Sequence, residues 1–205
     1  MKRVPLPEPW RRRAIVIADA PVSDEWFTAD ELAVAESFRL AKRTAEWKLS
    51  RVAAKQMAIE LRLCTSPRDC IVDRPWLHAP GARRYVSISH SGGFAAAAID
   101  AEPVGIDVER VRDLKESAAH LFLTGDETDV MRGSGIANRM LHFWAAKEAA
   151  WKRLGGATET LKRVPLKLEA ETATGLRFDH VETFATGEIV IALTRPTSSA
   201  GSSRR

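Results

Sequence analysis

The spacing of hydrophobic and polar residues predicts short strands and amphipathic helices in both halves of the chain. Apolar residues that alternate or run together over a few positions indicate strands, and apolar residues three or four apart indicate helices. The predicted strands are 14–18, 85–90, 94–100, 104–109, 164–171, 176–178 and 188–194, and the predicted helices are 28–38, 44–63, 114–123, 125–132 and 135–154. Because this order lacks a regular strand–helix–strand alternation, it predicts an α+β fold.

Local signals refine this pattern. Thr28, followed three residues later by Glu31, forms a capping box at the start of helix 28–38. Turn residues separate three consecutive strands over 85–109, which predicts an antiparallel meander. Residues 64–84 contain three prolines and a glycine, so we expect a loop there.

Composition excludes several classes of protein. With 45% hydrophobic and 28% charged residues, the chain is neither disordered nor fibrous. Its longest apolar run, 94–99, is far shorter than the roughly 20 residues of a membrane span. Cys64 and Cys70 lie six apart without a CxxC pair or a Cys/His cluster, so we expect neither a disulfide framework nor a zinc site. A reducing cytoplasm fits best, and Asp19 makes the apolar stretch 14–20 a poor export signal.

The length of 205 residues suits one compact domain or two tightly fused halves of about 100 residues each. We expect an N-terminal half over 14–102 and a C-terminal half over 103–194, although no sequence repeat relates them. The basic segment 1–13 is expected to be mobile, and the Ser/Gly-rich tail 195–205 is expected to be disordered.

The charge balance favours a polyanionic or acidic partner. The chain has 31 Lys and Arg against 27 Asp and Glu, a net charge of +4. Nucleic acid, a phosphorylated small molecule and an acidic protein all fit this balance. Helix 44–63 carries a basic stripe formed by Lys48, Arg51, Lys55 and Arg62. This stripe is either an ordinary solvated face or a binding surface.

Two carboxylates share one face of the predicted strand 104–109. The two-residue period of a strand places Asp107 and Glu109 on the same side, opposite the intervening Val108. Oxygen ligands without histidine or cysteine suit Mg²⁺ or Mn²⁺ rather than zinc. Gly105, just before them, indicates close approach of another group. The alternative is a solvated strand face that happens to carry two acids.

Helix 135–154 carries a third carboxylate. Glu148 and Lys152 stand four residues apart on one face, beside Trp144 and Trp151. The simplest alternative for Glu148 and Lys152 is a surface ion pair, but two neighbouring tryptophans make full solvation of that face less favourable.

The segment SISHSGG places His90 at the end of a strand, in a turn rich in serine and glycine. Several donors with little bulk around them suit a phosphate oxygen. A histidine satisfied by its neighbours at a strand end is the alternative. Nucleophilic catalysis is not favoured, because no Gly-x-Ser-x-Gly elbow surrounds Ser89 or Ser91.

In order along the chain, SISHSGG, GIDVE and FWAAKEAAWK resemble the signature of the 4′-phosphopantetheinyl transferase superfamily. Weaker elements are RTAEWKLSRVAAKQMAI, DRPWL and LFLTGDE, so the resemblance spans about residues 28–156. The chain length resembles the surfactin and enterobactin synthetase type. That type implies two pseudo-symmetric α+β halves fused in one monomeric chain, each with a small antiparallel sheet and a long helix, and an active site between them.

The resemblance implies transfer of 4′-phosphopantetheine from coenzyme A to a serine of an apo acyl or peptidyl carrier protein, with release of adenosine 3′,5′-bisphosphate. Asp107, Glu109 and Glu148 would bind Mg²⁺, or Mn²⁺, against the pyrophosphate. Glu148 would also take the serine proton, directly or through water, and Lys152 would stabilise the leaving bisphosphate. The residues implied to hold coenzyme A are Arg43, Arg51, Arg74, Ser89, His90, Ser91, Gly92 and Lys152. Neither nucleic acid nor a membrane is an expected partner, and the expected location is the cytoplasm.

Helix 28–38 lacks the lysines that some surfactin-type members place there, so Arg39 or Lys42 would substitute in contacts to the 3′-phosphate. Two other functions remain open from the residues alone. A metal-dependent nuclease or another phosphoryl-transfer enzyme would use the same three carboxylates and lysine. A nucleic-acid-binding module would use helix 44–63, although Trp47 is the single aromatic residue interleaved there.

Overall fold

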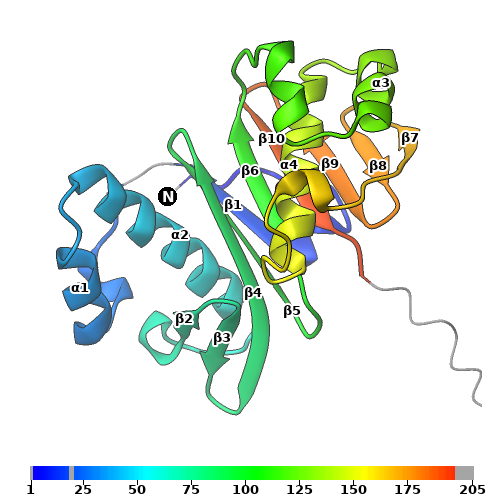
Figure 1. Cartoon of the computed structure of the whole chain (residues 1–205). Helices are drawn as coiled ribbons and strands as arrows, with labels where there is room; N and C mark the ends of the chain where they lie inside the picture. The colour runs from blue at the N-terminus through cyan, green and yellow to red at the C-terminus, as the bar shows by residue number, and fades with distance from the viewer. Residues whose placement is uncertain (1, 19–20, 197–205) are drawn as a thin grey trace, which may run out of the picture.

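The chain folds into two halves of the same architecture, each with a five-stranded antiparallel sheet and a long helix against it (Figure 1). A computed structural model describes residues 2–18 and 21–196. The first half contains β1 (Ala14–Ala18), α1 (Ala29–Glu36), α2 (Ala41–Glu60), β2 (Ile71–Asp73), β3 (Trp76–Ala79), β4 (Ala82–Ser91) and β5 (Phe94–Asp100). The second half contains β6 (Ile106–Arg110), α3 (Gly125–Gly133), α4 (Arg139–Arg153), β7 (Leu168–Glu171), β8 (Leu176–Phe178), β9 (Val181–Ala185) and β10 (Ile189–Thr194).

The two sheets repeat one topology. The strands follow the order β1-β5-β4-β3-β2 in the first sheet and β6-β10-β9-β8-β7 in the second. Each strand therefore has a counterpart at the same place in the other sheet, and α1 and α2 correspond to α3 and α4 in chain order. The predicted α+β class is confirmed, and the repeated topology agrees with two related halves. The exact boundaries expected for these halves stay a prediction.

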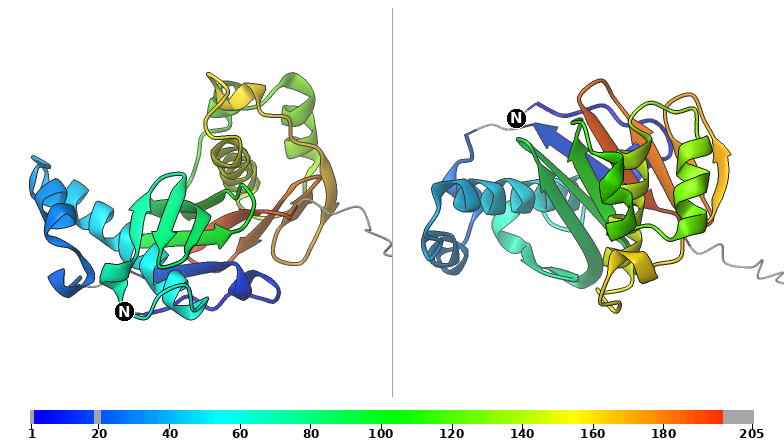
Figure 2. Two further views of the ribbon diagram at one scale, coloured as in Figure 1. Left: turned by 90° about the horizontal axis from the view of Figure 1, so that it is seen from below. Right: turned by 45° about the horizontal axis from the view of Figure 1, so that its top comes forward.

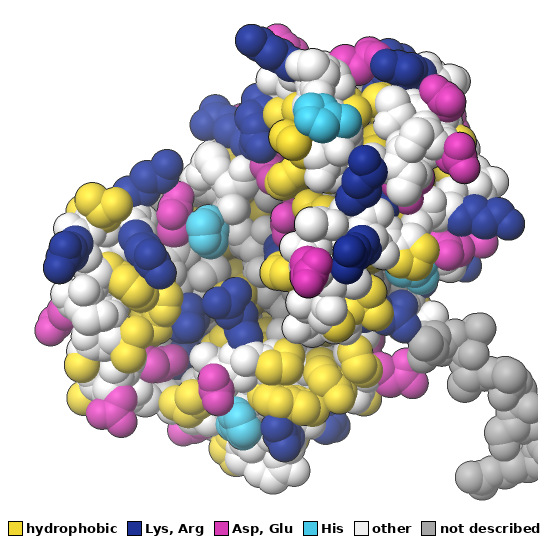
Figure 3. All heavy atoms as spheres, in the orientation of Figure 1, with side chains coloured by type: hydrophobic (Ala, Val, Ile, Leu, Met, Phe, Trp, Pro, Cys, Tyr) yellow, Lys and Arg dark blue, Asp and Glu magenta, His cyan; other side chains and the backbone are white. Residues whose placement is uncertain are grey.

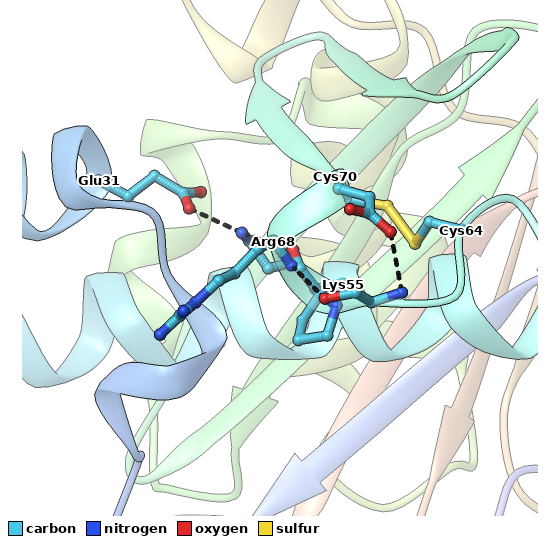
Figure 4. Close-up of a disulfide and its surroundings, with 8 residues drawn as sticks. Glu31, Lys55, Cys64, Arg68 and Cys70 are labelled. Carbon is cyan, nitrogen blue, oxygen red and sulfur yellow. Dashed lines mark hydrogen bonds and ion pairs between the residues drawn. A yellow bond between two sulfur atoms is a disulfide. The ribbon is translucent and has the colours of Figure 1, made fainter.

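A buried lysine ties the two helices of the first half together. Thr28 and Glu31 form the predicted capping box at the start of α1. The carboxylate of Glu31 also accepts a hydrogen bond of 2.7 Å from Nζ of Lys55, whose side chain is fully buried on α2. Nζ of Lys55 donates a second hydrogen bond of 2.9 Å to the carbonyl oxygen of Pro67, and Figure 4 shows Lys55 and Glu31 near the disulfide. Burial of this ammonium is offset by a counter-charge and a carbonyl.

The second half contains the same arrangement. Thr124 and Glu127 form a capping box at the start of α3, and Glu127 pairs at 2.6 Å with the fully buried Lys147 of α4. Nζ of Lys147 also donates to the carbonyl oxygen of Val164. The two halves thus use one device to dock a short capped helix onto a long one, although their sequences show no visible repeat.

The cores follow from this architecture. One cluster of buried residues lies between α2 and the first sheet, and a second lies among α3, α4 and the second sheet. A third cluster joins the two sheets and includes Val16, Ala96, Val108 and Ile191. Figure 2 shows α2 and α4 each lying along a face of its own sheet.

The junction between the halves runs along β4 and β6. Strand β6 is an edge strand of the second sheet, and it pairs with β10 rather than with β5. The predicted meander over 85–109 is therefore wrong at its third strand. Side-chain hydroxyls replace the missing ladder, because Ser87 Oγ accepts from the backbone N–H of Ile106 at 3.0 Å and Ser91 Oγ accepts from that of Arg110 at 3.2 Å.

Other differences from the predicted elements have local causes. Residues 64–84, expected to be a loop, contain β2 and β3, because the prolines and the glycine of this segment lie outside these two strands. Strand β9 was not predicted. Helix α4 begins only at Arg139 because Asn138 adopts a left-handed backbone conformation with φ of 56°.

The N-terminal segment lies along the free edge of β1. Arg3 forms a bridge with Ile17, and the backbone N–H of Val4 donates to the carbonyl oxygen of Val16 at 2.9 Å. Trp10 is buried in the core between the sheets. These contacts cover residues that were expected to be mobile on composition. The expected disordered tail lies outside the described residues from 197 onward.

Cys64 and Cys70 form a disulfide, contrary to the sequence-based expectation (Figure 4). A short 3-10 helix, Pro67–Asp69, begins with a capping box and folds the intervening segment back, so that the two Cα atoms lie 6.6 Å apart. That distance is within the usual range for a disulfide. The spacing of six residues did not reveal this turn. Among the described residues, no helix is long and apolar enough to cross a membrane.

We expect Glu127→Gln to lower the free energy of unfolding by about 3 kcal/mol. Glutamine can keep the capping box, but it leaves the buried ammonium of Lys147 without a counter-charge. Glu159→Gln is the matched control, because its side chain is 81% exposed and pairs with the exposed Arg163, so little change is expected. Denaturant unfolding followed by circular dichroism measures both variants, and equal effects would contradict the assigned role of Glu127.

Candidate active site

A cavity of about 320 Å³ opens between α2 and β4, and Lys152 of α4 reaches it from the other half. Its lining residues are Phe38, Arg43, Glu46, Trp47, Ser50, Arg51, Arg74, Ile88, Ser89, His90 and Lys152. Six of the eight residues expected to hold coenzyme A therefore share one pocket. In Figure 3 the surface is hollowed between the two halves, and Lys and Arg side chains gather in the hollow.

Helix α2 supplies one wall of the pocket because its pocket residues recur three and four apart. The guanidinium of Arg51 lies 3.7 Å from the ring centroid of Trp47, and that of Arg43 lies 4.9 Å from the ring centroid of Phe38. Burial, together with the neighbouring charge of Arg74, lowers the pKa of Arg51 to about 10. Arginines held close together against their mutual repulsion favour a bound polyanion.

The predicted basic stripe of helix 44–63 is not one surface. Arg51 points into the pocket, Lys55 is fully buried against Glu31, and Lys48 pairs with Asp24 at 2.6 Å. The stripe is therefore neither wholly a solvated helix face nor wholly a binding surface, because its lysines and arginines lie in different surroundings.

His90 stands at the mouth of the pocket and is partly exposed. Its Nδ1 lies 4.0 Å from Oε2 of Glu46. Glu46 was not singled out from the sequence, and Trp47 was considered only as an aromatic residue of a nucleic-acid-binding helix. Both lie on the same face of α2 as Arg43 and Arg51. The regular spacing along α2 was the signal that could have found them.

Lys152 forms its ion pair with Asp107 rather than with Glu148. Nζ of Lys152 donates to Oδ1 of Asp107 at 2.7 Å and to the carbonyl oxygen of Ile106 at 3.1 Å. Oγ of Ser89 donates to the same Oδ1 at 2.7 Å. The surface ion pair considered for Glu148 and Lys152 is therefore replaced by a pair that joins α4 to β6.

The second oxygen of Asp107, Oδ2, is buried and has no hydrogen-bond partner among the described residues. Burial raises the pKa of Asp107, and the hydrogen bonds from Lys152 and Ser89 oppose that shift. An unpartnered buried carboxylate oxygen is costly, so it indicates a missing partner.

Glu148 lies on α4 one turn before Lys152 and is half-buried. Burial raises the pKa of its carboxyl, the charges of Asp107 and Glu109 raise it further, and the charge of Lys152 lowers it. These electrostatic effects place the three predicted carboxylates in one neighbourhood. In the part of the chain that the structure describes, Glu148 has no ion pair or hydrogen bond through its side chain.

Gly105 explains how α4 comes so close to β6. A Cβ atom at this position would overlap the carbonyl oxygen of Ala149. The absence of a side chain lets the helix backbone lie directly on the start of the strand, which brings Lys152 onto Asp107. The expected close approach at Gly105 is confirmed.

Glu109 is held by three donors. Its Oε2 accepts hydrogen bonds from Ser91 Oγ at 2.8 Å and Arg112 Nη1 at 2.6 Å, and its Oε1 accepts from the indole N–H of Trp144 at 3.0 Å. Ser91 thus supports a carboxylate and does not line the pocket. Gly92 does not line it either, because it packs against the side chain of Arg110.

Carboxylate oxygens are suitable ligands for a hard cation, although the described side chains are not already arranged around a metal position. Within residues 2–18 and 21–196, no group of three or more His, Cys, Asp or Glu is placed to hold a metal ion. The donor set nevertheless consists of carboxylate oxygens alone, and Asp107 Oδ2 lacks a partner. Oxygen ligands of this kind suit Mg²⁺.

The corresponding place in the second half also has a cavity, of about 590 Å³, between α4, the β7–β8 turn and the end of β9. The described residues that line it include no Lys or Arg. In the first half, Arg43 and Arg51 of α2 and Arg74 of the β2–β3 turn occupy the matching elements. The repeated architecture therefore provides two hollows, and only one of them carries the charge that an anion needs.

Comparison with known proteins shows which family the second half of the chain resembles. Residues 103–195 match the model of the 4′-phosphopantetheinyl transferase superfamily. The chain is similar to 4′-phosphopantetheinyl transferase psf-1 of Bacillus pumilus, with 30% identity over 101 residues that cover 47% of this chain and 43% of the relative. It is also similar to the 4′-phosphopantetheinyl transferases ffp of Bacillus subtilis and Sfp of Bacillus subtilis strain 168, with 29% and 30% identity over 91 residues. Each of these two alignments covers 43% of this chain and 38% of the relative.

The chain thus spans less than half the length of the curated relatives that it matches. The matched segment 103–195 contains the carboxylates Asp107, Glu109 and Glu148 and the ammonium of Lys152, whereas the arginine-lined wall of the pocket lies outside it. With the named relatives beside this geometry, residues 103–195 of the chain belong to the 4′-phosphopantetheinyl transferase superfamily.

Proposed function

We propose that this protein transfers the 4′-phosphopantetheine group from coenzyme A to a serine hydroxyl of an apo carrier protein and releases adenosine 3′,5′-bisphosphate. The main observation behind the proposal is that a basic pocket of one half lies beside the carboxylates of the other half. One half contributes an arginine-lined pocket, and the other contributes Asp107, Glu148 and Lys152 beside it. The names of three relatives support this transferase activity.

The pocket would bind the phosphates of coenzyme A. That substrate carries a pyrophosphate and a 3′-phosphate, and Arg43, Arg51, Arg74 and His90 supply donors that suit phosphate oxygens. Trp47 holds the guanidinium of Arg51 in place by stacking, so less side-chain freedom is lost when the phosphate binds. Ser89 lines the pocket as well as contacting Asp107, and it connects the two surfaces.

Asp107, Glu109 and Glu148 are the residues that would hold Mg²⁺, or Mn²⁺. When bound, the cation would neutralise negative charge on the pyrophosphate. The unpartnered Oδ2 of Asp107 and the free carboxylate of Glu148 support this assignment within the described residues.

The transfer forms one bond and breaks another at the same phosphorus. The serine oxygen bonds to the phosphorus that carries pantetheine, and the bond from that phosphorus to the bridging oxygen breaks. The electron pair leaves with adenosine 3′,5′-bisphosphate, and the serine proton passes to Glu148, directly or through water. Burial raises the pKa of Glu148 and makes it a better proton acceptor than an exposed glutamate. Lys152 would stabilise the charge on the leaving phosphate.

The proposed partner is an acyl or peptidyl carrier protein, and the chain is proposed to act as a monomer in the cytoplasm. A monomer suffices because both surfaces of the site come from one chain.

Intact-protein mass spectrometry tests the proposal. Incubation of an apo carrier protein with coenzyme A, Mg²⁺ and this protein should add the mass of one phosphopantetheine. Asp107→Asn and Glu148→Gln should reduce the rate of this gain by at least about 100-fold, because each removes a charge from the reaction centre. Glu159→Gln, at an exposed glutamate that pairs with the exposed Arg163, is the control and should keep full activity. No gain with any carrier type, or cleavage of DNA or RNA instead, would refute the proposal.

The pH dependence of transfer gives a second prediction. The carboxylate of Glu148 accepts a proton only above its pKa, which burial raises above the ordinary value. Turnover should therefore fall as the pH is lowered, with a midpoint above the roughly 4.3 of a free glutamate side chain. Turnover at saturating coenzyme A and carrier protein, measured across pH, checks this limb. A profile that stays flat down to the ordinary glutamate value would exclude Glu148 as the base.

A further inference from the structure

Glu109 is the only one of the three proposed cation ligands whose two carboxylate oxygens both have described partners. Oε2 is shared by Ser91 and Arg112, and Oε1 receives the indole N–H of Trp144. The direction of this carboxylate is therefore set by its neighbours rather than by solvent.

The three donors differ in how firmly they are held. Arg112 is 48% exposed and lies in the segment after β6, so its ion pair is screened and contributes little orientation. Trp144 is partly buried on α4, and its ring packs edge-on against the buried Phe122 with centroids 5.1 Å apart. The direction of its N–H is thus fixed by packing.

Trp144 also differs from Arg112 in charge. An indole N–H donates a hydrogen bond but brings no positive charge. The contact at Oε1 therefore does not neutralise Glu109, whereas the guanidinium of Arg112 at Oε2 partly does. Asp107 likewise shares one oxygen with a cation, the ammonium of Lys152, but it has no neutral donor at its other oxygen among the described residues. Donors of this kind, placed behind a metal ligand, orient the ligand and raise the affinity for the metal.

We propose that Trp144 is a positioning residue that holds the carboxylate of Glu109 in the direction needed to bind a divalent cation. The inference rests on the proposed function, because it assigns a role within the same site. It goes beyond the proposed function because it assigns a role to Trp144 that the other tryptophan of α4, Trp151, does not have.

Trp151 supplies a matched control on the same helix. Its indole N–H donates a hydrogen bond of 2.9 Å to the carbonyl oxygen of Thr158 and contacts no carboxylate that the structure describes. Trp144→Phe and Trp151→Phe therefore each remove one indole hydrogen bond of similar length while keeping an aromatic ring. Only the first removes a donor from a proposed cation ligand.

The affinity of each variant for Mn²⁺ is measured by isothermal titration calorimetry with coenzyme A present. We expect Trp144→Phe to bind Mn²⁺ about 10-fold more weakly and Trp151→Phe to bind it like the wild type. In a Glu109→Gln background, Trp144→Phe should cause no further loss, because the positioned carboxylate is already gone. Equal affinity of Trp144→Phe and wild type, or an equal loss in Trp151→Phe, overturns the inference.

A second measurement uses the wild-type protein alone, so its result does not depend on whether a variant folds. Addition of Mg²⁺ should shift the indole ¹⁵N–H resonance of Trp144 and leave that of Trp151 in place; an unmoved Trp144 signal at saturating cation overturns the inference. If the wild type transfers phosphopantetheine with Mg²⁺ but Trp144→Phe binds the cation normally, this inference fails and the proposed function stands. If the wild type transfers nothing and binds no divalent cation, both fail.

Discussion

The contact between β4 and β6 is the interaction on which the rest of the site depends. An edge strand buried against another sheet leaves backbone N–H groups without a ladder, and each unsatisfied group costs about 1–3 kcal/mol. Ser87 and Ser91 satisfy two of these groups with their hydroxyls, and Ser89 between them binds Asp107. Alternate residues of one strand thus join the two halves and bring the carboxylates of β6 to the edge of the arginine-lined pocket.

Equivalent strands of the two halves carry different residues, so the described residues place carboxylates at only one of the two corresponding positions. The five residues of β1 pair along β5 as the five residues of β6 pair along β10, so Ile15 and Ile17 stand where Asp107 and Glu109 stand in the second half. Both isoleucines are buried in the core against α2. The edge of β1 is covered by the N-terminal segment, which places Trp10 beside Phe184. The edge of β1 is therefore covered by apolar contacts, whereas β6 presents carboxylates beside the arginine-lined pocket.

Much of the local structure and the candidate chemistry could be predicted from the sequence. Strand 14–18, strand 94–100 and the capping box at Thr28 were predicted as they occur, because period, propensity and caps act over a few residues. Strands β2 and β3 were missed because the prolines and the glycine of residues 64–84 indicated a loop, and β9 was not predicted. The basic stripe misled because burial of Lys55 depends on Glu31, which lies 24 residues away.

The sequence by itself determined the α+β class and the placement of Asp107 and Glu109 on one face of a strand. The family resemblance, rather than the residue pattern, pointed to six residues that line the pocket. Only the tertiary structure decided which groups meet: Lys152 pairs with Asp107 rather than with its helical neighbour Glu148, and Ser91 supports Glu109 instead of lining the pocket. The disulfide between Cys64 and Cys70 likewise depends on a turn that the spacing does not reveal. The physical reason is the distance along the chain over which each interaction acts. Periodicity and capping are set by neighbours along the chain, whereas the partner of a charged side chain is set by how closely α4 can lie on β6, which the missing side chain of Gly105 permits.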